Sequence, residues 1–435
     1  MNPRNSTLFQ KKIKSIAAFG LGMLFLLAGT SAFADSNSSP SGKNLNSLIS
    51  IALSNNPGII AAKKTADSAA IKVRTVSVLP DPELMVESMN NPLGSVMDSS
   101  TQGTEVALSQ MVPFPGKLNA ASKRQQADAG VANESYELKR LGVKRDVSLM
   151  YYGIASIDVS LTIEKRKQKQ LEAMGAVIAA QYSGGKATLS EYIRTNNMKA
   201  MVQTEILAME AERARMRAEL SAMLGGTILP EITFSYTLSP LTQIPSEKEI
   251  LNMALANFPE IRMKEAMERS AKAEREQMKL ELVPDFTIKG ALDFMAGGDK
   301  TYTLGISVPL PLFLSFKQIP LAKAAGLMSE GAAREREETE NMVTSEVQSR
   351  YTALKKANET LILYQSTIQR TSEQGFEVAL KDYQVNRIGF SELIDSFQTF
   401  YDSSLALEKT KQLLMEQRVY LDYFTAEALQ WGENL

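Results

Sequence analysis

The chain has 435 residues, with 48 basic and 49 acidic side chains and neither Cys nor His. This composition excludes catalytic triads that contain histidine, cysteine nucleophiles, zinc sites with Cys or His ligands and c-type haem attachment. The balanced charge also argues against a nucleic-acid partner. A hydrolase based on two carboxylates stays chemically open, but no compact catalytic domain is visible in the sequence. We therefore predict a protein that is not an enzyme and has no cofactor.

Residues 1–34 are typical of a cleaved secretory signal. A basic start that includes Arg4 precedes an apolar run of 14 residues, 16–29, and Ala32 and Ala34 supply the small residues of a cleavage site. A run of this length is too short for a bilayer-spanning helix, which needs about 20 residues. Cleavage removes four basic residues and no acidic one, which leaves 44 basic and 49 acidic residues. We expect an exported chain with a small negative charge.

The mature sequence consists of two similar halves. A helix interrupted at Pro57 has a counterpart interrupted at Pro259, and the segments 182–193 and 383–394 align with each other. Such duplication predicts two copies of one structural unit. The expected organisation is a first repeat over 35–230, a linker over 231–245 and a second repeat over 246–435.

Each half also contains two candidate β-strands. Apolar residues alternate with polar or small ones along 285–294 and 302–310, and the first half offers 82–89 and 104–111 around the polar loop 90–103. An apolar face for lipid and a polar face for a water-filled lumen are typical of membrane strands. For any single pair, a soluble hairpin with one face on a core is the favoured interpretation. Two matching pairs in an exported, repeated chain reverse this preference and favour membrane strands.

The remaining sequence predicts very long helices. No proline occurs between Leu118 and Tyr182, and a helix of about 60 residues reaches roughly 90 Å. In the second half, apolar residues recur every seven positions, as in a coiled-coil seam, at Val347, Leu354, Leu361 and Ile368. Each half is therefore expected to form a helical hairpin with a long arm and a return arm of roughly 35 residues.

The ends of these hairpins carry turn signals. Gly184 and Gly185 end the first long arm, and Thr188 with Glu191 predicts a capping box that starts the return helix. In the second half, Gly389 takes the cap position and Glu392 the third helical position. These patterns place both tips in the sequence.

Four strands cannot close a membrane barrel, because bacterial barrels have at least eight. Three copies would supply twelve strands, leave no open sheet edge and bury the second apolar face of the helices. We therefore expect a mostly α-helical homotrimer in which a 12-strand membrane β-barrel continues into a long α-helical barrel. A soluble periplasmic coiled-coil scaffold without a pore is the alternative.

The order of motifs resembles the TolC-type outer-membrane efflux protein family. The resemblance covers nearly the whole mature chain and rests on the strand entry Leu79-Pro80-Asp81-Pro82, the crossover Pro113-Phe-Pro115-Gly116-Lys117 and the hairpins at Tyr182 and Tyr383. Both proline motifs are most similar to the branch that serves resistance-nodulation-division pumps exporting heavy-metal cations.

This resemblance implies a passive trimeric duct in the outer membrane of a Gram-negative-type cell. The duct extends into the periplasm, where a periplasmic adaptor and an inner-membrane pump complete a tripartite efflux system. A duct for ABC-type protein secretion is the alternative within the family.

The resemblance also implies roles for residues at the periplasmic entrance. Glu392 and Asp395 match acidic residues that ring this entrance, and Tyr383 matches a tyrosine that holds it shut. Arg387 falls one position before the expected basic partner of that tyrosine, where Ile388 stands. Capping alone also explains Glu392 and Glu191.

Two further interpretations concern the tips and the methionines. Arg194 is the counterpart of Asp395 in the first repeat, which suggests an ion pair between hairpins. The adaptor-docking candidates share a position in the tip turns, and they are Gly184, Gly185, Lys186, Thr188, Arg387, Ile388 and Gly389. Turn chemistry alone also explains the glycines. The 21 Met residues are scattered along helices, where Met usually fills gaps in the core, so no metal site is expected from them.

Overall fold

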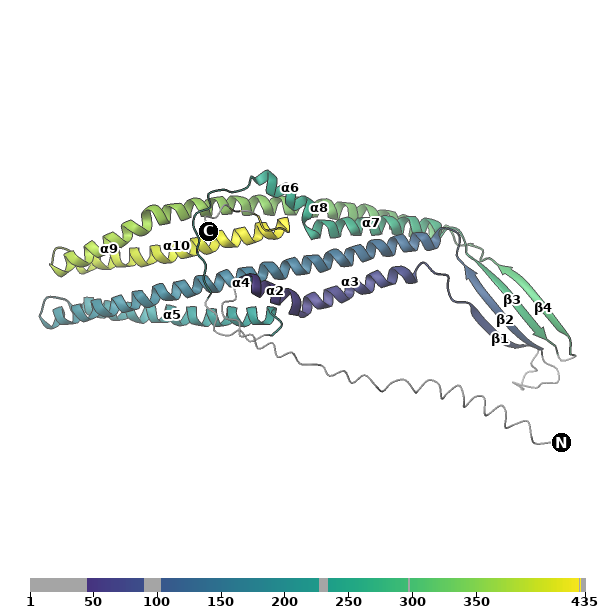
Figure 1. Ribbon diagram of the computed structural model, residues 1–435, viewed down its shortest axis with the longest axis horizontal. Coiled ribbons are helices and arrows are strands. Elements are labelled where there is room, and N and C mark those ends of the chain that lie inside the picture. Colours follow the sequence, from purple (N-terminus) through teal and green to yellow (C-terminus); the bar gives the residue numbers. More distant parts are fainter. Residues whose placement is uncertain (1–44, 90–102, 227–233, 296–297, 430, 432–435) are drawn as a thin grey trace, which may run out of the picture. The chain divides into compact units, whose positions relative to one another are not determined.

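The computed structural model describes residues 45–89, 103–226, 234–295, 298–429 and 431 (Figure 1). The expected signal over 1–34 and most of the loop over 90–103 lie outside these ranges. Within them the chain forms helical hairpins and one antiparallel sheet. None of the described helices is both long enough and apolar enough to cross a membrane.

Each half begins with a short helix that a proline interrupts, as the sequence predicts. The four helices are α2 (Leu45–Asn55), α3 (Pro57–Thr75), α6 (Glu247–Asn257) and α7 (Pro259–Leu280). Proline starts a helix well because its fixed φ is helical and its missing N–H has no helical partner in the first turn. The Asn56 side chain accepts from the Ile59 N–H (3.2 Å) and donates to the carbonyl of Met223 (2.9 Å), so this break is tied to the first hairpin.

The sheet contains the two strands predicted in each half. They are β1 (Glu83–Met89), β2 (Gly103–Val112), β3 (Phe286–Phe294) and β4 (Lys300–Ser307), and they pair antiparallel in the order β1-β2-β3-β4. The prediction that the last strand reaches Leu310 is wrong, because β4 ends at Ser307. Pro309 has no N–H to donate to a ladder, and pairing stops just before it.

The register gives the sheet two chemically different faces. One row across all four strands is apolar and consists of Val86, Val106, Leu292 and Tyr302, whereas the neighbouring row on the opposite face is polar and consists of Glu87, Glu105, Asp293 and Thr301. Lys289 forms an ion pair with Glu105. Successive residues of a strand point to opposite faces, so the predicted alternation is present in the structure.

The first hairpin has the predicted form. Helix α4 (Lys117–Ser183) is continuous over 67 residues, and α5 (Leu189–Met223) returns over 35. In the second hairpin, α10 (Phe390–Thr425) returns over 36 residues. Helix α4 packs against α3, α5, α7 and α10, so it connects both halves of the chain.

The long arm of the second hairpin is interrupted, which the sequence analysis did not foresee. Helix α8 (Gln318–Leu363) passes into a π-helical turn, η1 (Tyr364–Ile368), before α9 (Gln369–Gln384). These pieces, of 46, 5 and 16 residues, together match the 67 residues of α4. The predicted seam is buried at Val347, Leu354 and Leu361, but it is wrong at Ile368, which is 37% exposed. A π turn is wider than an α turn and rotates the following residues away from the seam.

The segment between the repeats joins the two hairpins. Phe234 packs in a core with α2, α4 and α5, whereas Leu238 and Leu241 pack with α6, α8 and α10. The buried Asn358 side chain accepts from the Leu241 N–H (2.8 Å) and donates to the Leu241 carbonyl (3.1 Å). These contacts fix the two halves to each other at some distance from the hairpin tips. A third core cluster lies at the tips themselves.

Candidate functional site at the hairpin tips

The turns at 184–188 and 385–389 end the two hairpins, and one apolar core joins the helices that lead to them. Ile178 of α4 and Phe397 of α10 are fully buried in this core together with Phe376 of α9. The side chains therefore place the two tips beside each other, although they are about two hundred residues apart in the sequence.

The first tip has the predicted turn and cap. Gly184 is the C-cap of α4, and Gly185 has a φ of +70°, a backbone conformation that favours glycine. The Thr188 hydroxyl accepts from the Glu191 N–H at 3.2 Å, and the Glu191 carboxylate accepts from the Thr188 N–H at 3.0 Å. This confirms the predicted capping box.

The second tip has its N-cap at the position that corresponds to Thr188, but no side chain caps the helix there. Gly389 is the N-cap of α10, as predicted, but it has no side chain that could accept from the first turn. Glu392 is therefore not part of a capping box. Arg387 lies 3.4 Å from Asp382, and both belong to the same hairpin. The arginine is thus paired within its own tip.

A group of five residues, which we name the tip seam, connects the two tips: Gln181, Glu191, Arg194, Tyr383 and Phe390. The Tyr383 hydroxyl donates to Oε1 of Gln181 at 2.9 Å. Burial of the ring raises the pKa of Tyr383, and the negative charge of Glu191 raises it further. The phenol therefore stays protonated and keeps its role as the donor between the hairpins.

Gln181 is not among the residues predicted from the sequence, although a signal is present. Each tip carries a polar residue directly before its tyrosine, Gln181 before Tyr182 and Asp382 before Tyr383. The repeat therefore marks a tyrosine and a hydrogen-bonding partner in both halves. Within one copy, the tyrosine of the second half, Tyr383, forms its hydrogen bond with the polar residue of the first half, Gln181.

The ion pair suggested between Arg194 and Asp395 is not formed within one copy and stays a prediction for contacts between copies. The guanidinium of Arg194 lies over the ring of Phe390, 5.9 Å from its centroid, and no ion pair joins it to Asp395 among the residues that the structure describes. An aromatic ring attracts a cation over its face. The counterparts of Arg194 and Phe390 in the other repeat are Asp395 and Leu189. These two residues cannot form a contact between a cation and an aromatic ring, so the repeat does not duplicate it.

Glu392 and Asp395 are both exposed and line one side of an open groove between α9 and α10. The groove has a volume of about 660 Å³, and its other lining residues are mostly small and polar, among them Thr371 and Thr399, with the apolar Ile368 and Phe376. The two carboxylates are three residues apart on α10 and so share one face of the helix. This face differs chemically from the tip seam, which combines two aromatic rings with one amide and one pair of opposite charges.

The other predicted tip residues divide by exposure. Gly184, Gly185, Lys186, Thr188 and Gly389 are exposed. Ile388 is only partly exposed because it packs against the tip core. Ile388, at the place expected for a basic residue, therefore contributes apolar packing to the second tip.

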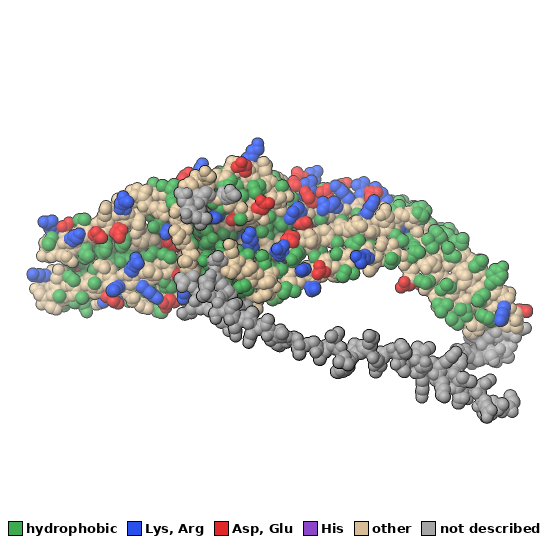
Figure 2. Space-filling view, viewed as in Figure 1, with side chains coloured by type: hydrophobic (Ala, Val, Ile, Leu, Met, Phe, Trp, Pro, Cys, Tyr) green, Lys and Arg blue, Asp and Glu red, His purple; other side chains and the backbone are tan. Residues whose placement is uncertain are grey.

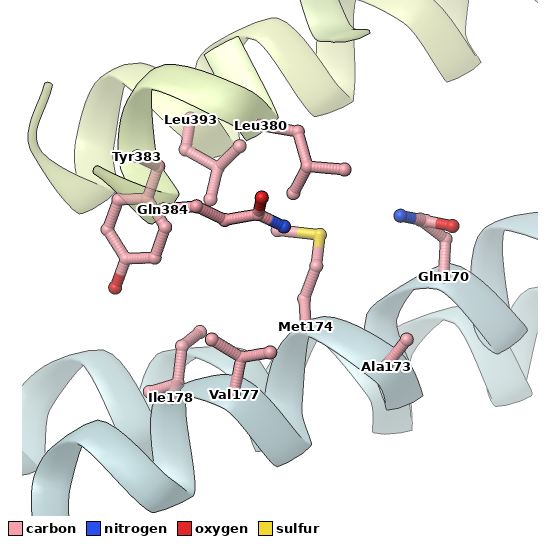
Figure 3. A pocket seen from close by; sticks show the side chains of 9 residues that line it. All are labelled: Gln170, Ala173, Met174, Val177, Ile178, Leu380, Tyr383, Gln384 and Leu393. Atoms are coloured by element: carbon pink, nitrogen blue, oxygen red, sulfur yellow. The ribbon is translucent and has the colours of Figure 1, made fainter. Parts of the chain in front are cut away.

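A small cavity of about 100 Å³ lies beside the tip seam, between α4 and the second hairpin (Figure 3). Met174 and Ile178 line it from α4, and Leu380, Tyr383 and Leu393 line it from the opposite side. Packing is therefore incomplete where the hairpins meet. In the described part of the chain, no group of three or more acidic side chains is arranged to hold a metal ion.

Comparisons with known proteins place this geometry in context. The outer membrane efflux protein family matches residues 48–226. The cobalt-zinc-cadmium resistance protein CzcC of Cupriavidus metallidurans is 22% identical over 376 residues, which cover 83% of this chain and 84% of CzcC. The predicted resemblance to TolC-type outer-membrane efflux proteins is confirmed.

Solved structures share the fold over most of the chain. CusC, whose structures concern folding and transmembrane channel formation, matches with a TM-score of 0.75 and 15% identity, covering 89% of this chain and 95% of CusC. The outer membrane protein VceC of Vibrio cholerae matches with a TM-score of 0.74 and 16% identity, covering 89% of this chain and 97% of VceC. These relatives are channel, efflux and resistance proteins, and none is named as an enzyme.

Proposed function

We propose that three copies of this chain form a passive duct through the outer membrane and periplasm. The sheet carries the proposal, because its apolar face is widely exposed in one copy and the edges of β1 and β4 have no partner among the described residues. Leu84, Leu304 and Ile306 are 69%, 78% and 73% exposed. Open sheet edges of this kind invite pairing with another chain, and three sheets supply the twelve strands of a closed barrel.

The polar face of the sheet would line the lumen of this duct. In the described residues, four acidic side chains, Glu83, Glu87, Glu105 and Asp293, share this face with one basic side chain, Lys289. Directly opposed like charges destabilise a sheet, so the acidic row across β1, β2 and β3 needs a functional reason. A lumen with an excess of carboxylates would concentrate cations.

The tips would form the periplasmic entrance and the docking surface. In a threefold arrangement, Glu392 and Asp395 would place six carboxylates around one axis. The hydrogen bond between Tyr383 and Gln181 would hold the second hairpin against the first and keep the entrance narrow. The exposed turns would contact a periplasmic adaptor, and an inner-membrane pump, for which the resemblance favours the resistance-nodulation-division type, would supply the energy.

Cations are the cargo that the charges favour, and CzcC is named for cobalt, zinc and cadmium resistance. The test is to delete the gene and measure minimum inhibitory concentrations for metals, dyes and antibiotics. We expect increased sensitivity to heavy-metal cations alone. Sensitivity to many drugs without sensitivity to metals would contradict the cation assignment and leave the duct itself standing.

The duct is tested on the purified full-length chain. We expect a trimer in detergent and cation-selective conductance in planar lipid bilayers. A monomer that is stable in buffer without detergent, releases with the periplasmic contents and gives no conductance would support the coiled-coil scaffold instead.

A further inference from the structure

The two places where the chain passes from the sheet into a long helix differ strongly. The first crossover, 113–116, is short and held in place, because the Phe114 N–H donates to Asp285 at 2.8 Å and Lys117 forms ion pairs with Asp285 (2.8 Å) and Glu281 (3.1 Å). The second crossover, 308–317, is longer and lies on the outside. We name 308–317 the apolar ledge.

The apolar ledge exposes large side chains that a water-facing loop would not carry. Only one of its ten residues, Lys317, is charged. Leu312 is 80% exposed and Phe316 is 83% exposed, and the exposed large apolar residues of the ledge are Val308, Leu310, Leu312, Phe313 and Phe316. Contiguous exposed apolar surface of this kind marks a site of interaction.

The backbone of the ledge is partly folded on itself, which lowers the cost of placing it in a poorly hydrated environment. Pro309 and Pro311 have no N–H group, and four other N–H groups donate to carbonyls inside the ledge: Leu312 to Leu310 (2.9 Å), Leu314 to Pro311 (3.2 Å), and Phe316 and Lys317 to Phe313 (3.0 and 2.9 Å). Backbone polar groups without partners are costly away from water. The ledge is thus a compact set of turns.

The start of the ledge continues the apolar face of the sheet and not its open edge. Tyr302, Leu304 and Ile306 stand on the apolar face of β4, and Val308 and Leu310 continue the same two-residue spacing up to the turns that begin at Leu312. Figure 2 shows that hydrophobic side chains dominate this end of the described chain. A second copy that pairs along the β4 edge would lie in the plane of the sheet, whereas side chains of a face stand perpendicular to that plane.

We propose that the apolar ledge at 308–317 inserts into the headgroup and upper acyl region of a phospholipid leaflet, at the helical end of the sheet. This inference rests on the proposed function, since it assumes that the apolar face of the sheet contacts lipid. Aromatic side chains are favoured at the membrane interface, and Phe313 and Phe316 lie where the apolar band of the strands ends. Lys317 lies beside them and would reach lipid phosphates.

Tryptophan fluorescence tests the depth of the ledge, because Trp431 is the only tryptophan of the chain. In the full chain carrying Trp431→Phe, Phe316→Trp or Phe313→Trp introduces a reporter with little change in shape. The protein is reconstituted into phosphatidylcholine and phosphatidylglycerol vesicles whose acyl chains are brominated either near the headgroup or near the chain end. We expect blue-shifted emission that the shallow bromines quench more strongly than the deep ones.

Leu207→Trp in the same background is the matched control, because Leu207 of α5 is also apolar and exposed but belongs to the first hairpin. Its emission should be insensitive to both brominated lipids. If the reporters at 313 and 316 are unquenched by either lipid while the vesicles still conduct, the ledge is covered by protein and this inference is overturned alone. If the protein does not associate with vesicles and does not conduct, the proposed duct fails as well.

Discussion

The hydrogen bond from Tyr383 to Gln181 is the single polar contact on which we base the proposed narrow entrance. Tyr383→Phe removes the donor and leaves the ring in place, so we expect a loss of about 1 kcal/mol between the hairpins. In planar bilayers this loss should appear as a larger or more frequent conducting state. Gln181→Ala should have a similar effect, and the double variant should be no worse than either single variant, since both remove the same bond.

Tyr192→Phe is the control for this experiment. Tyr192 lies at the same tip and stacks on Tyr182 with ring centroids 6.2 Å apart, and this stacking does not need the hydroxyl. The variant should conduct like the unaltered protein. Equal effects of Tyr192→Phe and Tyr383→Phe would contradict a specific role for the Tyr383 bond.

Asp422, near the end of α10, accepts hydrogen bonds from the chain that follows this helix. Its pKa lies in a pH range that experiments can reach. Burial raises its pKa to about 6, although the Leu429 N–H (2.9 Å), the charge of Arg418 and Trp431 Nε1 (3.2 Å) oppose the shift. A raised pKa in the folded state means that the stabilising contribution is complete below the unfolded pKa of about 4 and is lost as the pH rises through about 6. Trp431 fluorescence should therefore titrate with a midpoint near pH 6.

Asp422→Asn is the informative variant, because it keeps an acceptor oxygen and removes the titration. We expect its Trp431 emission to be flat between about pH 4 and pH 7, and its resistance to denaturant to lose the pH dependence of the unaltered chain in that range. A midpoint that persists near pH 6 in the variant would assign the titration to another group.

The acidic row on the polar face of the sheet should set ion selectivity. Glu87→Gln removes one carboxylate per copy from this row, so the preference for potassium over chloride, measured as a reversal potential in a salt gradient, should decrease. Asp67→Asn, on the exposed surface of α3 away from the sheet, makes the same chemical change elsewhere and should have no effect. An unchanged reversal potential in Glu87→Gln would remove the row from the conduction path.

The π turn makes the long arm of the second hairpin weaker than its counterpart in the first. Between Leu361 and Phe376 no residue is buried, and α10 is instead held by polar contacts, Gln369 to Ser404 (3.1 Å) and Ser372 to Ser403 (2.8 Å). The matching stretch of α4 buries Leu161, Leu171 and Met174. Few buried apolar contacts imply easy local opening.

Amide hydrogen exchange measures this difference within one sample. We expect faster exchange over 362–375 than over 161–174, since both stretches occupy the same place in their repeats. Gln369→Ala should accelerate the exchange of 362–375 further. Gln168→Ala should change the exchange of 161–174 little, because apolar packing remains when the hydrogen bond from Gln168 to Gln203 (2.7 Å) is lost. Equal protection of the two stretches in the unaltered chain would contradict a weak point at η1.

The sequence was sufficient for the elements whose cause is local. Neighbouring residues determine the helix breaks at Pro57 and Pro259, the capping box at Thr188 and the alternation along the strands. The structure confirms all of these features. The π turn was not predictable in this way, because a heptad pattern assumes uniform helical turns and Ile368 fits the pattern perfectly in sequence. Gln181 and Phe390 were missed because their roles depend on how two distant tips pack.

The repeat also predicts how copies meet. Within one copy Tyr383 bonds to Gln181, so the equivalent contact between copies would join Tyr182 to Asp382. The chain has no cysteine, which makes a clean test available: Tyr182→Cys with Asp382→Cys should give disulfide-linked oligomers, whereas Gln181→Cys with Tyr383→Cys should give a crosslink inside one chain. Crosslinking of the first pair only within monomers would contradict this contact between copies.

The two long arms contain the same number of residues, even though one is interrupted by a π turn. Unequal arms would leave the tips at different depths, so an insertion in one half would have to be matched in the other. Insertions and deletions among relatives should therefore occur in pairs, at corresponding places of both halves. Ancestry by duplication would in this way continue to constrain how the protein lengthens or shortens during evolution.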